Sequence, residues 1–277
     1  MLNIYYQYTT NGPGKVVNNL KKGLGLLGEK FQENISLPSQ GEKGLFLQED
    51  GRFGSYDERN LIIGPNICTL PIDNAFVMRK RYKKIIVPSE WVKNLYIRWI
   101  PEEKIVVWPV GIDTDLFSDK KKYIKNIDCL IYFKRRTANE LQLLISMLIN
   151  MNQSYCVMEY GNYSESEFIK NIERCRYGIV LDKPESQGIA IQEMLSSNLP
   201  LFVWDAVKWD DRGEEFSCEA TSIPYWSLEC GVKVVDEKEI KSKFEEFLLN
   251  KDELNPREFI INNLGLKKQA LEIVELF

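Results

Sequence analysis

The stretch LDKPESQGIAIQEMLSSNLPLFVW, residues 181–204, decides the expected fold. It has the pattern of a strand end, a polar turn, a helix and a second strand. A strand–helix–strand order is typical of units that build a parallel sheet. Two glutamates, Glu185 and Glu193, lie eight residues apart across the turn and the helix. The same unit therefore carries two carboxylates that a parallel sheet can present to one ligand.

Outward from this stretch, strands and helices alternate in both halves of the chain. Short apolar runs that predict strands covered on both faces occupy residues 2–8, 44–48, 60–64, 83–89, 104–109, 128–133, 154–160, 177–182 and 231–235. A polar segment rich in Asp and Lys, 110–126, separates the two series. We therefore predict an α/β fold with two Rossmann-like parallel-sheet domains, residues 1–116 and 117–277, with a ligand cleft at the carboxyl ends of their strands.

Composition excludes several classes of site. The chain has no histidine, which removes Ser-His-Asp and Cys-His machinery and any His-ligated zinc. None of the six cysteines forms a C-x-x-C pair, and the net charge of −4 argues against a nucleic-acid-binding protein. No apolar run approaches the length of a membrane span, and the N-terminus has no signal-peptide pattern. We expect a cytoplasmic protein without a metal.

A glycine-containing loop follows the first strand. Gly12 and Gly14 in TNGPGKVVNNL let backbone N–H groups approach an anion at a helix start. The spacing fits neither the dinucleotide fingerprint nor the Walker A loop. A plain strand–helix turn is the alternative interpretation.

A basic turn follows the strand 128–133. Lys134, Arg135 and Arg136 precede a helix N-terminus, where cations and the helix dipole attract an anion such as a diphosphate. A solvated basic turn is the alternative.

The opening stretch is the third candidate site. Glu185 lies in the turn, and Gln187, Gly188 and Ile189 open the helix. Gly188 permits a close backbone approach to a ligand, and the carboxylate of Glu193 can accept two hydroxyls of a vicinal diol. Ordinary surface charge is the alternative for a pair of glutamates.

Four segments carry a resemblance to a known family, and they occur in the same order: GPGKVVNNLKKGL (12–24), VPSEWVKNLY (87–96), VWPVGIDTDLF (107–117) and PESQGIAIQEMLSSNLPLFVWD (184–205). The last is similar to the motif E-G-F-G-x-x-x-x-E-A-M-A-x-G-x-P-V of retaining glycosyltransferases of family 4, which have the GT-B fold. The resemblance implies a metal-independent, retaining hexosyltransferase that uses a nucleotide-sugar donor, a UDP- or GDP-sugar, and no further cofactor. It also implies that the last helix, about 257–275, crosses back to the N-terminal domain.

The resemblance implies roles for the candidate residues. Glu193 would hold the ribose hydroxyls, Glu185 would contact the transferred sugar, and Lys134 and Arg135 would neutralise the departing diphosphate. Backbone amides would come from Gln187, Gly188 and Ile189 in the donor domain, 117–277, and from Gly12 and Gly14 in the acceptor-side domain, 1–116.

The sequence departs from the family in one respect that concerns the reaction. Members often place a histidine near the transferred sugar, and this chain has none; Asn66 and Asp73 are the alternatives. A non-catalytic sugar-nucleotide-binding protein or partner subunit, and a sugar-nucleotide epimerase, are competing functions.

The acceptor is expected to be a glycan or a lipid-linked molecule. The basic cluster MRKRYKK, with its cations in 79–84, could rest on an anionic membrane that carries such an acceptor. A solvated helix end is the alternative interpretation of this cluster.

Overall fold

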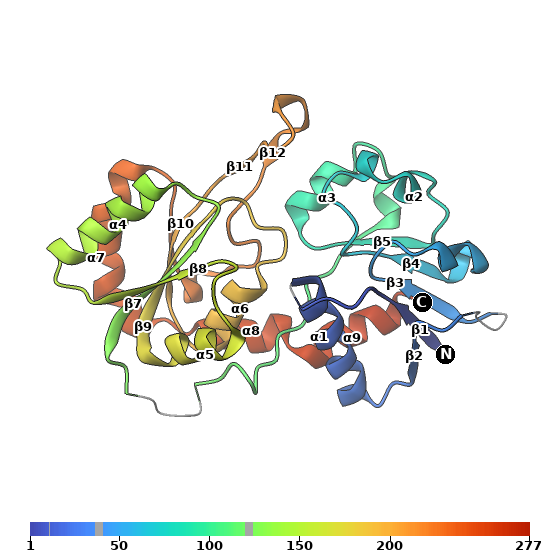
Figure 1. Ribbon diagram of the computed structural model, residues 1–277, viewed down its shortest axis with the longest axis horizontal. Coiled ribbons are helices and arrows are strands. Elements are labelled where there is room, and N and C mark those ends of the chain that lie inside the picture. The colour runs from blue at the N-terminus through green and yellow to red at the C-terminus, as the bar shows by residue number, and fades with distance from the viewer. Residues whose placement is uncertain (11, 37–40, 120–123) are drawn as a thin grey trace. The chain divides into compact units, whose positions relative to one another are not determined.

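The structure is a computed structural model that describes residues 1–10, 12–36, 41–119 and 124–277. It divides into two compact units (Figure 1). Unit 1 comprises Met1–Gly111 and Leu264–Phe277, and unit 2 comprises Ile112–Asn263. Of the polar segment expected between the domains, residues 120–123 lie outside the described residues.

Unit 1 is built on a parallel sheet with the strand order β2-β1-β3-β4-β5-β6. The strands are β1 (Leu2–Tyr5), β2 (Phe31–Glu33), β3 (Lys43–Phe46), β4 (Leu61–Ile63), β5 (Lys84–Val87) and β6 (Ile105–Val107). The helices are α1 (Gly12–Leu27), α2 (Ala75–Met78), α3 (Glu90–Tyr96) and α9 (Leu266–Glu275). In Figure 1, α1 and α9 cover one face of this sheet, while α2 and α3 lie on the other.

The C-terminal segment packs into unit 1 through α9. A Cβ on Gly23 of α1 would stand 2.5 Å from the carbonyl oxygen of Leu266, so glycine permits the close approach of the two helices. The indole of Trp108 donates to the carbonyl oxygen of Gln269 at 2.9 Å. The single helix expected near 257–275 is two helices, α8 (Pro256–Leu264) and α9, because Gly265 between them has an extended backbone.

Unit 2 is built on a second parallel sheet with the strand order β13-β10-β9-β7-β8. The strands are β7 (Ile127–Lys134), β8 (Tyr155–Glu159), β9 (Cys175–Asp182), β10 (Leu201–Trp204) and β13 (Gly231–Val234). The helices are α4 (Ala138–Asn150), α5 (Glu165–Arg174), α6 (Ile189–Ser196), α7 (Ile240–Asn250) and α8.

The helices cover both faces of this sheet. Leu144 and Leu148 of α4 and Phe244 and Phe247 of α7 bury their side chains against one face, beside Tyr177 of β9. Figure 1 shows α5 and α6 on the opposite face. Burial on both faces explains why the strands are nearly continuous apolar runs.

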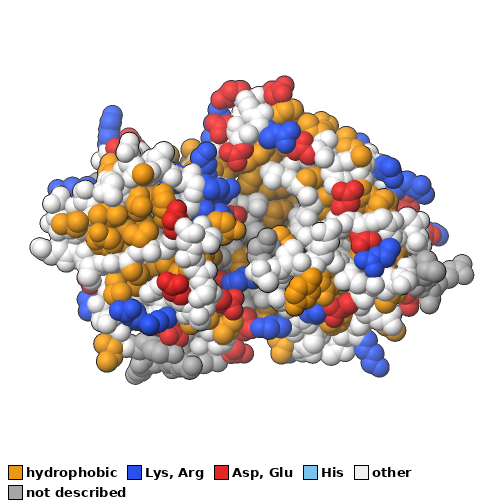
Figure 2. Space-filling view, viewed as in Figure 1, with side chains coloured by type: hydrophobic (Ala, Val, Ile, Leu, Met, Phe, Trp, Pro, Cys, Tyr) orange, Lys and Arg blue, Asp and Glu red, His pale blue; other side chains and the backbone are white. Residues whose placement is uncertain are grey.

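A hairpin of β11 (Lys208–Trp209) and β12 (Cys218–Glu219) follows β10 and protrudes from unit 2 (Figure 1). Figure 2 shows acidic side chains gathered at its tip. The loop between its strands carries Asp210, Asp211, Glu214 and Glu215. In the described part of the chain, no helix is both long and apolar enough to span a membrane.

Candidate active site

Strands β7 and β9 are neighbours at the centre of the sheet of unit 2, and the chain leaves them in opposite directions. From β7 it runs to β8 on one side, and from β9 it runs to β10 on the other. Ligands of open parallel sheets bind at such a switch point, outside the carboxyl ends of the strands. The register pairs Lys134 with Asp182 as the last residues of β7 and β9. The basic turn and the opening stretch therefore meet at the edge where a ligand is expected.

The basic turn has an unusual backbone. Arg135 has a φ of 57°, in the left-handed region that side chains other than glycine seldom adopt. Thr137 then caps α4 in a reciprocal capping box with Glu140. Lys134 and Arg135 face Asp182 and Glu185, whereas Arg136 turns toward Glu140 and Trp204.

Lys134 lies between two carboxylates. Its Nζ donates to Glu185 Oε2 in a short contact and lies 3.8 Å from Asp182 Oδ2. It also stands 4.2 Å from the ring centroid of Tyr160. The side chain of Lys134 is only 13% exposed, so its charge is neutralised within the protein.

Arg135 is held by the same carboxylates. Its Nε donates to Asp182 Oδ1 at 3.1 Å, and its Nη2 donates to the carbonyl oxygen of Pro184 at 2.7 Å and lies 3.6 Å from Glu185 Oε2. Burial lowers the pKa of Arg135, but Asp182 and Glu185 outweigh it and raise that pKa. With a side chain 40% exposed, Arg135 is the more accessible of the two predicted diphosphate ligands.

The two carboxyl groups differ in their protonation. Burial raises the pKa of Asp182 to about 7, although Lys134 and Arg135 oppose this. Burial also acts to raise the pKa of Glu185, but Lys134 and Arg135 outweigh it and hold that pKa below its usual range. Glu185 is therefore an anion at neutral pH, and Asp182 titrates there.

Asp182 is the site residue that the sequence analysis missed. Its side chain is fully buried, and it contacts both Lys134 and Arg135. The available signal was an aspartate that ends a continuous apolar strand, followed at once by Lys183 and Pro184. A charged residue in that place has no reason to be buried unless it is paired.

The start of α6 depends on a glycine. Gly188 is the N-cap of α6 with a φ of 70°, and its ideal Cβ would lie 3.4 Å from Pro224 Cδ. The backbone carbonyl of Gln187 accepts from the side chain of Gln192 at 2.5 Å. This contact holds the turn that leads into Ile189, the first residue of α6. Since α6 begins at Ile189, the N–H groups of its first turn follow Glu185 closely in the sequence.

Glu193 lies in the second turn of α6 and is 2% exposed. The helix is buried nearly all round, since Ile191 and Leu195 are buried as well. The pair Glu185 and Glu193 thus belongs to one unit, with one member at the switch point and the other inside the adjoining helix. Its role in holding a ribose stays a prediction.

The glycine loop lies in unit 1. A Cβ on Gly14 would stand 1.9 Å from the carbonyl oxygen of Thr9, so the tight turn after β1 explains this glycine, whereas Gly12 faces open space. Asn66 Nδ2 donates to the carbonyl oxygen of Pro13 at 3.3 Å, which places Asn66 beside the loop. Asp73 ends a short 3₁₀ helix before α2.

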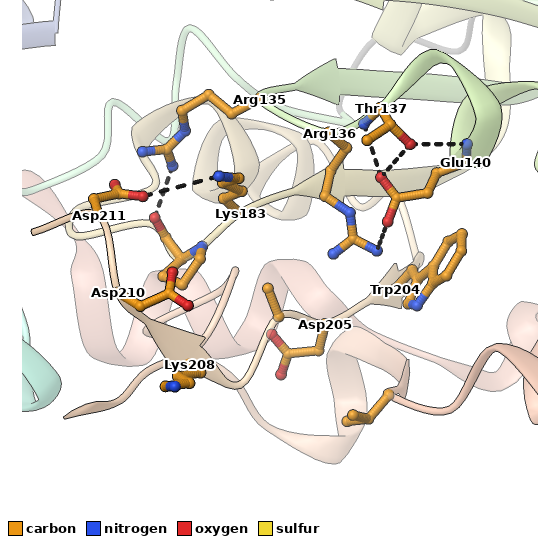
Figure 3. Close-up of a pocket in the computed structure, with 13 residues that line it drawn as sticks. Arg135, Arg136, Thr137, Glu140, Lys183, Trp204, Asp205, Lys208, Asp210 and Asp211 are labelled. Carbon is orange, nitrogen blue, oxygen red and sulfur yellow. Dashed lines mark hydrogen bonds and ion pairs between the residues drawn. The ribbon is translucent and has the colours of Figure 1, made fainter. Parts of the chain in front are cut away.

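A cavity of about 360 Å³ adjoins the basic turn on the side of α4 (Figure 3). Arg136 is bound to Glu140 at 2.8 Å and lies over the ring of Trp204 at 4.7 Å. Figure 3 shows the ion pair of Lys183 and Asp211, whose charged atoms are 3.9 Å apart. Acidic and basic side chains alternate around the wall, so the cavity is polar without a strong charge of either sign. In the described residues, no group of three or more acidic or Cys side chains could hold a metal ion.

The basic cluster in 79–84 is partly engaged within unit 1. Lys83 Nζ donates to the carbonyl oxygen of Leu276 at 2.8 Å, and Lys84 donates to that of Glu103. Arg81 stands 3.9 Å from Glu58 and keeps a side chain 80% exposed. Membrane contact through this cluster stays a prediction.

No protein-family model and no curated protein matches the sequence. Solved structures, in contrast, resemble the whole chain. The catalytic domain of starch synthase IV from Arabidopsis thaliana, bound to ADP and acarbose, aligns with a TM-score of 0.62 at 7% identity, over 99% of this chain and 98% of that one. HepE of Anabaena, in complex with UDP and glucose, aligns with a TM-score of 0.59 at 11% identity, over 99% and 98%. The lipopolysaccharide outer core galactosyltransferase WaaB aligns with a TM-score of 0.57 at 12% identity, over 99% and 98%.

At these identities the likeness establishes the fold. The chain has the GT-B fold, with one Rossmann-like parallel sheet in each unit. The GT-B fold that the four motifs implied is thereby confirmed, whereas the activity and the family stay predictions.

Proposed function

We propose that the chain is a retaining, metal-independent glycosyltransferase that moves a hexose from a nucleotide-sugar donor to an acceptor hydroxyl. The observation that carries the proposal is the meeting of Lys134, Arg135 and Glu185 at the switch point between β7 and β9, in a chain with the GT-B fold. Cations at that point can receive the diphosphate of a donor, where its charge develops as the sugar departs.

Each of these residues has its own role in the proposed transfer. Lys134 and Arg135 neutralise the leaving diphosphate, and the first N–H groups of α6, after Gly188, add hydrogen bonds without a metal. Glu185, an anion at neutral pH, faces the transferred sugar, whose anomeric centre becomes positive in the transition state. Glu193 accepts from the ribose hydroxyls. Catalysis of this kind depends on positioning and electrostatics, and it needs no histidine.

The donor class follows by similarity alone. HepE was solved with UDP and starch synthase IV with ADP, and a UDP-sugar is the donor we propose to test first, with a GDP-sugar next. A glycan or lipid-linked acceptor is proposed for unit 1, and a cytoplasmic location stays a prediction.

A thermal-shift panel of UDP, GDP, ADP and CMP tests the proposal. A nucleotide at tenfold its Kd stabilises the protein by about 1.4 kcal/mol, which is visible as a shift. We expect one nucleotide to shift the wild type and to lose its effect in Glu193→Ala. The matched control is Glu246→Ala on the exposed face of α7, which should respond as the wild type does. If no nucleotide shifts the wild type, the proposal is wrong.

A non-catalytic sugar-nucleotide-binding protein is the second candidate. It is favoured by the engagement of both cations with Asp182 and Glu185, since a diphosphate must displace part of these contacts. Release of UDP from a UDP-sugar in the presence of wild type, and its absence in Lys134→Met, would support the enzyme. Nucleotide binding without any release of UDP, with or without acceptors, would support the binding protein.

A further inference from the structure

Asp182 has a feature that ion pairing alone does not explain. Its side chain has no exposure, and its Oδ2 accepts no hydrogen bond from the described residues. The closest cation, Lys134 Nζ, stands 3.8 Å from that oxygen and donates to Glu185 instead. A buried carboxylate oxygen without a donor is costly as an anion, but it is a natural position for a proton.

Above its pKa of about 7, Asp182 is an anion, and the charges around it are then balanced in the unliganded protein. Lys134 and Arg135 supply two positive charges, and Asp182 and Glu185 supply two negative ones. A diphosphate held by the two cations adds negative charge to this cluster. At an effective dielectric constant of about 20, each added charge at about 6 Å raises a neighbouring carboxyl pKa by about two units. One carboxyl of the cluster must then bind a proton near neutral pH.

We propose that Asp182 takes up a proton from the solvent when a diphosphate binds to Lys134 and Arg135, so that anion binding at this site is coupled to protonation. The inference rests on the proposed function, because it requires a diphosphate at the switch point. No covalent bond changes. One proton moves from water or buffer to Asp182, and the protonated Oδ2 no longer repels the ligand.

Two observations distinguish Asp182 from Glu185 as the acceptor. Asp182 is fully buried with a pKa already raised to about 7, whereas Glu185 has a side chain 14% exposed and a pKa held below its usual range. Glu185 Oε1 also accepts from the backbone N–H of Ser186 at 3.1 Å, which favours its anionic form. The group nearer to neutrality binds the proton first.

The other groups around Asp182 are engaged in contacts of their own or stay neutral. Arg136 and the hydroxyl of Ser222 donate to its carbonyl oxygen, at 3.5 Å and 2.8 Å. Tyr132 of β7 is buried with a pKa raised above its usual value, so it stays neutral. Asp205, at the end of β10, has its own partner, Lys233, at 3.2 Å.

Isothermal titration calorimetry with UDP at pH 8 tests the inference, in buffers of different ionisation enthalpy. The second phosphate pKa is near 6, so UDP itself supplies no uptake at pH 8. With a free pKa of about 7 and a bound pKa of about 9, the wild type should take up about 0.8 proton per UDP. Its affinity for UDP should fall roughly tenfold or more between pH 7 and pH 9. Inorganic pyrophosphate should compete with UDP, because the site binds the diphosphate; since it carries a proton of its own at pH 8, it tests binding and UDP tests the proton uptake.

Asp182→Asn keeps the acceptor for Arg135 and removes the titration. It should bind UDP with almost no proton uptake and with an affinity that is flat from pH 7 to pH 9. Asp128→Asn is the matched control. Asp128 lies near the other end of β7. Burial acts to raise its pKa, but its contacts with Ser154 outweigh burial and hold that pKa below its usual range. The loss of its charge should therefore leave the proton uptake unchanged.

The outcomes are distinguishable. UDP binding without proton uptake overturns the inference and leaves the proposed function in place. Uptake that persists in Asp182→Asn but disappears in Glu185→Gln also overturns it. If neither UDP nor pyrophosphate binds, the proposed function fails together with the inference. If Asp182→Asn does not fold, infrared difference spectra of the wild type decide, because a protonated carboxyl band must appear with UDP, and its absence refutes the inference.

Discussion

Replacing Lys134 with Met should destabilise unit 2 by stranding two buried carboxylates. Lys134 stands 3.8 Å from Asp182 and is 13% exposed, so the pair attracts by about 4 kcal/mol at an effective dielectric constant of 20. Arg135 remains at 3.1 Å from Asp182 and 3.6 Å from Glu185 and offsets part of this loss. Met retains the length and packing of the chain. We therefore expect the free energy of unfolding to fall by about 3 kcal/mol at pH 7.5.

Urea denaturation followed by circular dichroism measures this loss, and hydrogen exchange in β9 locates it. The pH dependence has a definite sign. Because Lys134 and Arg135 lower the pKa of Glu185, their stabilising effect is present above the unfolded pKa of about 4.3 and is lost as the pH falls through the folded value. In Lys134→Met the stranded carboxylates bind protons more readily, so the difference from wild type should shrink from pH 7.5 to pH 4.

A second substitution separates charge from packing. Lys134→Met combined with Glu185→Gln removes one stranded charge and should recover at least about 1 kcal/mol. Lys243→Met breaks an exposed pair with Glu246 and should cause no measurable change in the free energy of unfolding. A loss below about 1 kcal/mol in Lys134→Met, or a loss that is as large at pH 4 as at pH 7.5, would refute the electrostatic account.

Three further substitutions test the packing within the two units, each by urea denaturation. Gly14→Ala places a Cβ 1.9 Å from the carbonyl oxygen of Thr9 and should destabilise unit 1 by about 1–3 kcal/mol, whereas Gly12→Ala, which faces open space, should not. Arg257→Ala removes the donor to the carbonyl oxygens of Thr114, Phe117 and Ser196 and should destabilise unit 2 by about 3 kcal/mol; an unchanged midpoint would contradict this. Phe244→Ala leaves a cavity in the core between α7 and β10 and should cost about 3–5 kcal/mol, with hydrogen exchange quickened in β10 rather than in unit 1.

The fold was largely predictable because the strands are short apolar runs bounded by turn residues. The sheet of unit 2 follows this pattern in β7, β9 and β10, which are buried on both faces. The failures have local causes. β2, at Phe31–Glu33, has three residues and little burial, so it leaves no apolar signal. The strands of the hairpin, β11 and β12, have two residues each, which is too short for a pattern to appear in the sequence. The amphipathic pattern continues across Gly265, so it does not indicate that this residue separates α8 from α9.

The candidate site was predictable where chemistry and spacing coincide in the sequence. The eight-residue interval between Glu185 and Glu193 can be seen in the sequence whatever the register of the strands. The same is true of the three consecutive cations after β7. The burial of Asp182 was not predictable in the same way. It depends on the pairing of the last residues of β7 and β9, which brings Lys134 and Arg135 to an aspartate 48 and 47 residues away along the chain.

This pairing changes what the cations can do. Lys134 and Arg135 would be free to bind an anion if they pointed into water, and their affinity would then depend mainly on ionic strength. In the structure each is shared between Asp182 and Glu185, so a diphosphate must compete with carboxylates that are already in place. The free energy of binding is then the difference between two sets of ionic contacts, and protonation of one carboxylate shifts that difference toward the ligand. A site without histidine can in this way respond to pH near neutrality, because burial gives an aspartate the titration range that histidine has in water.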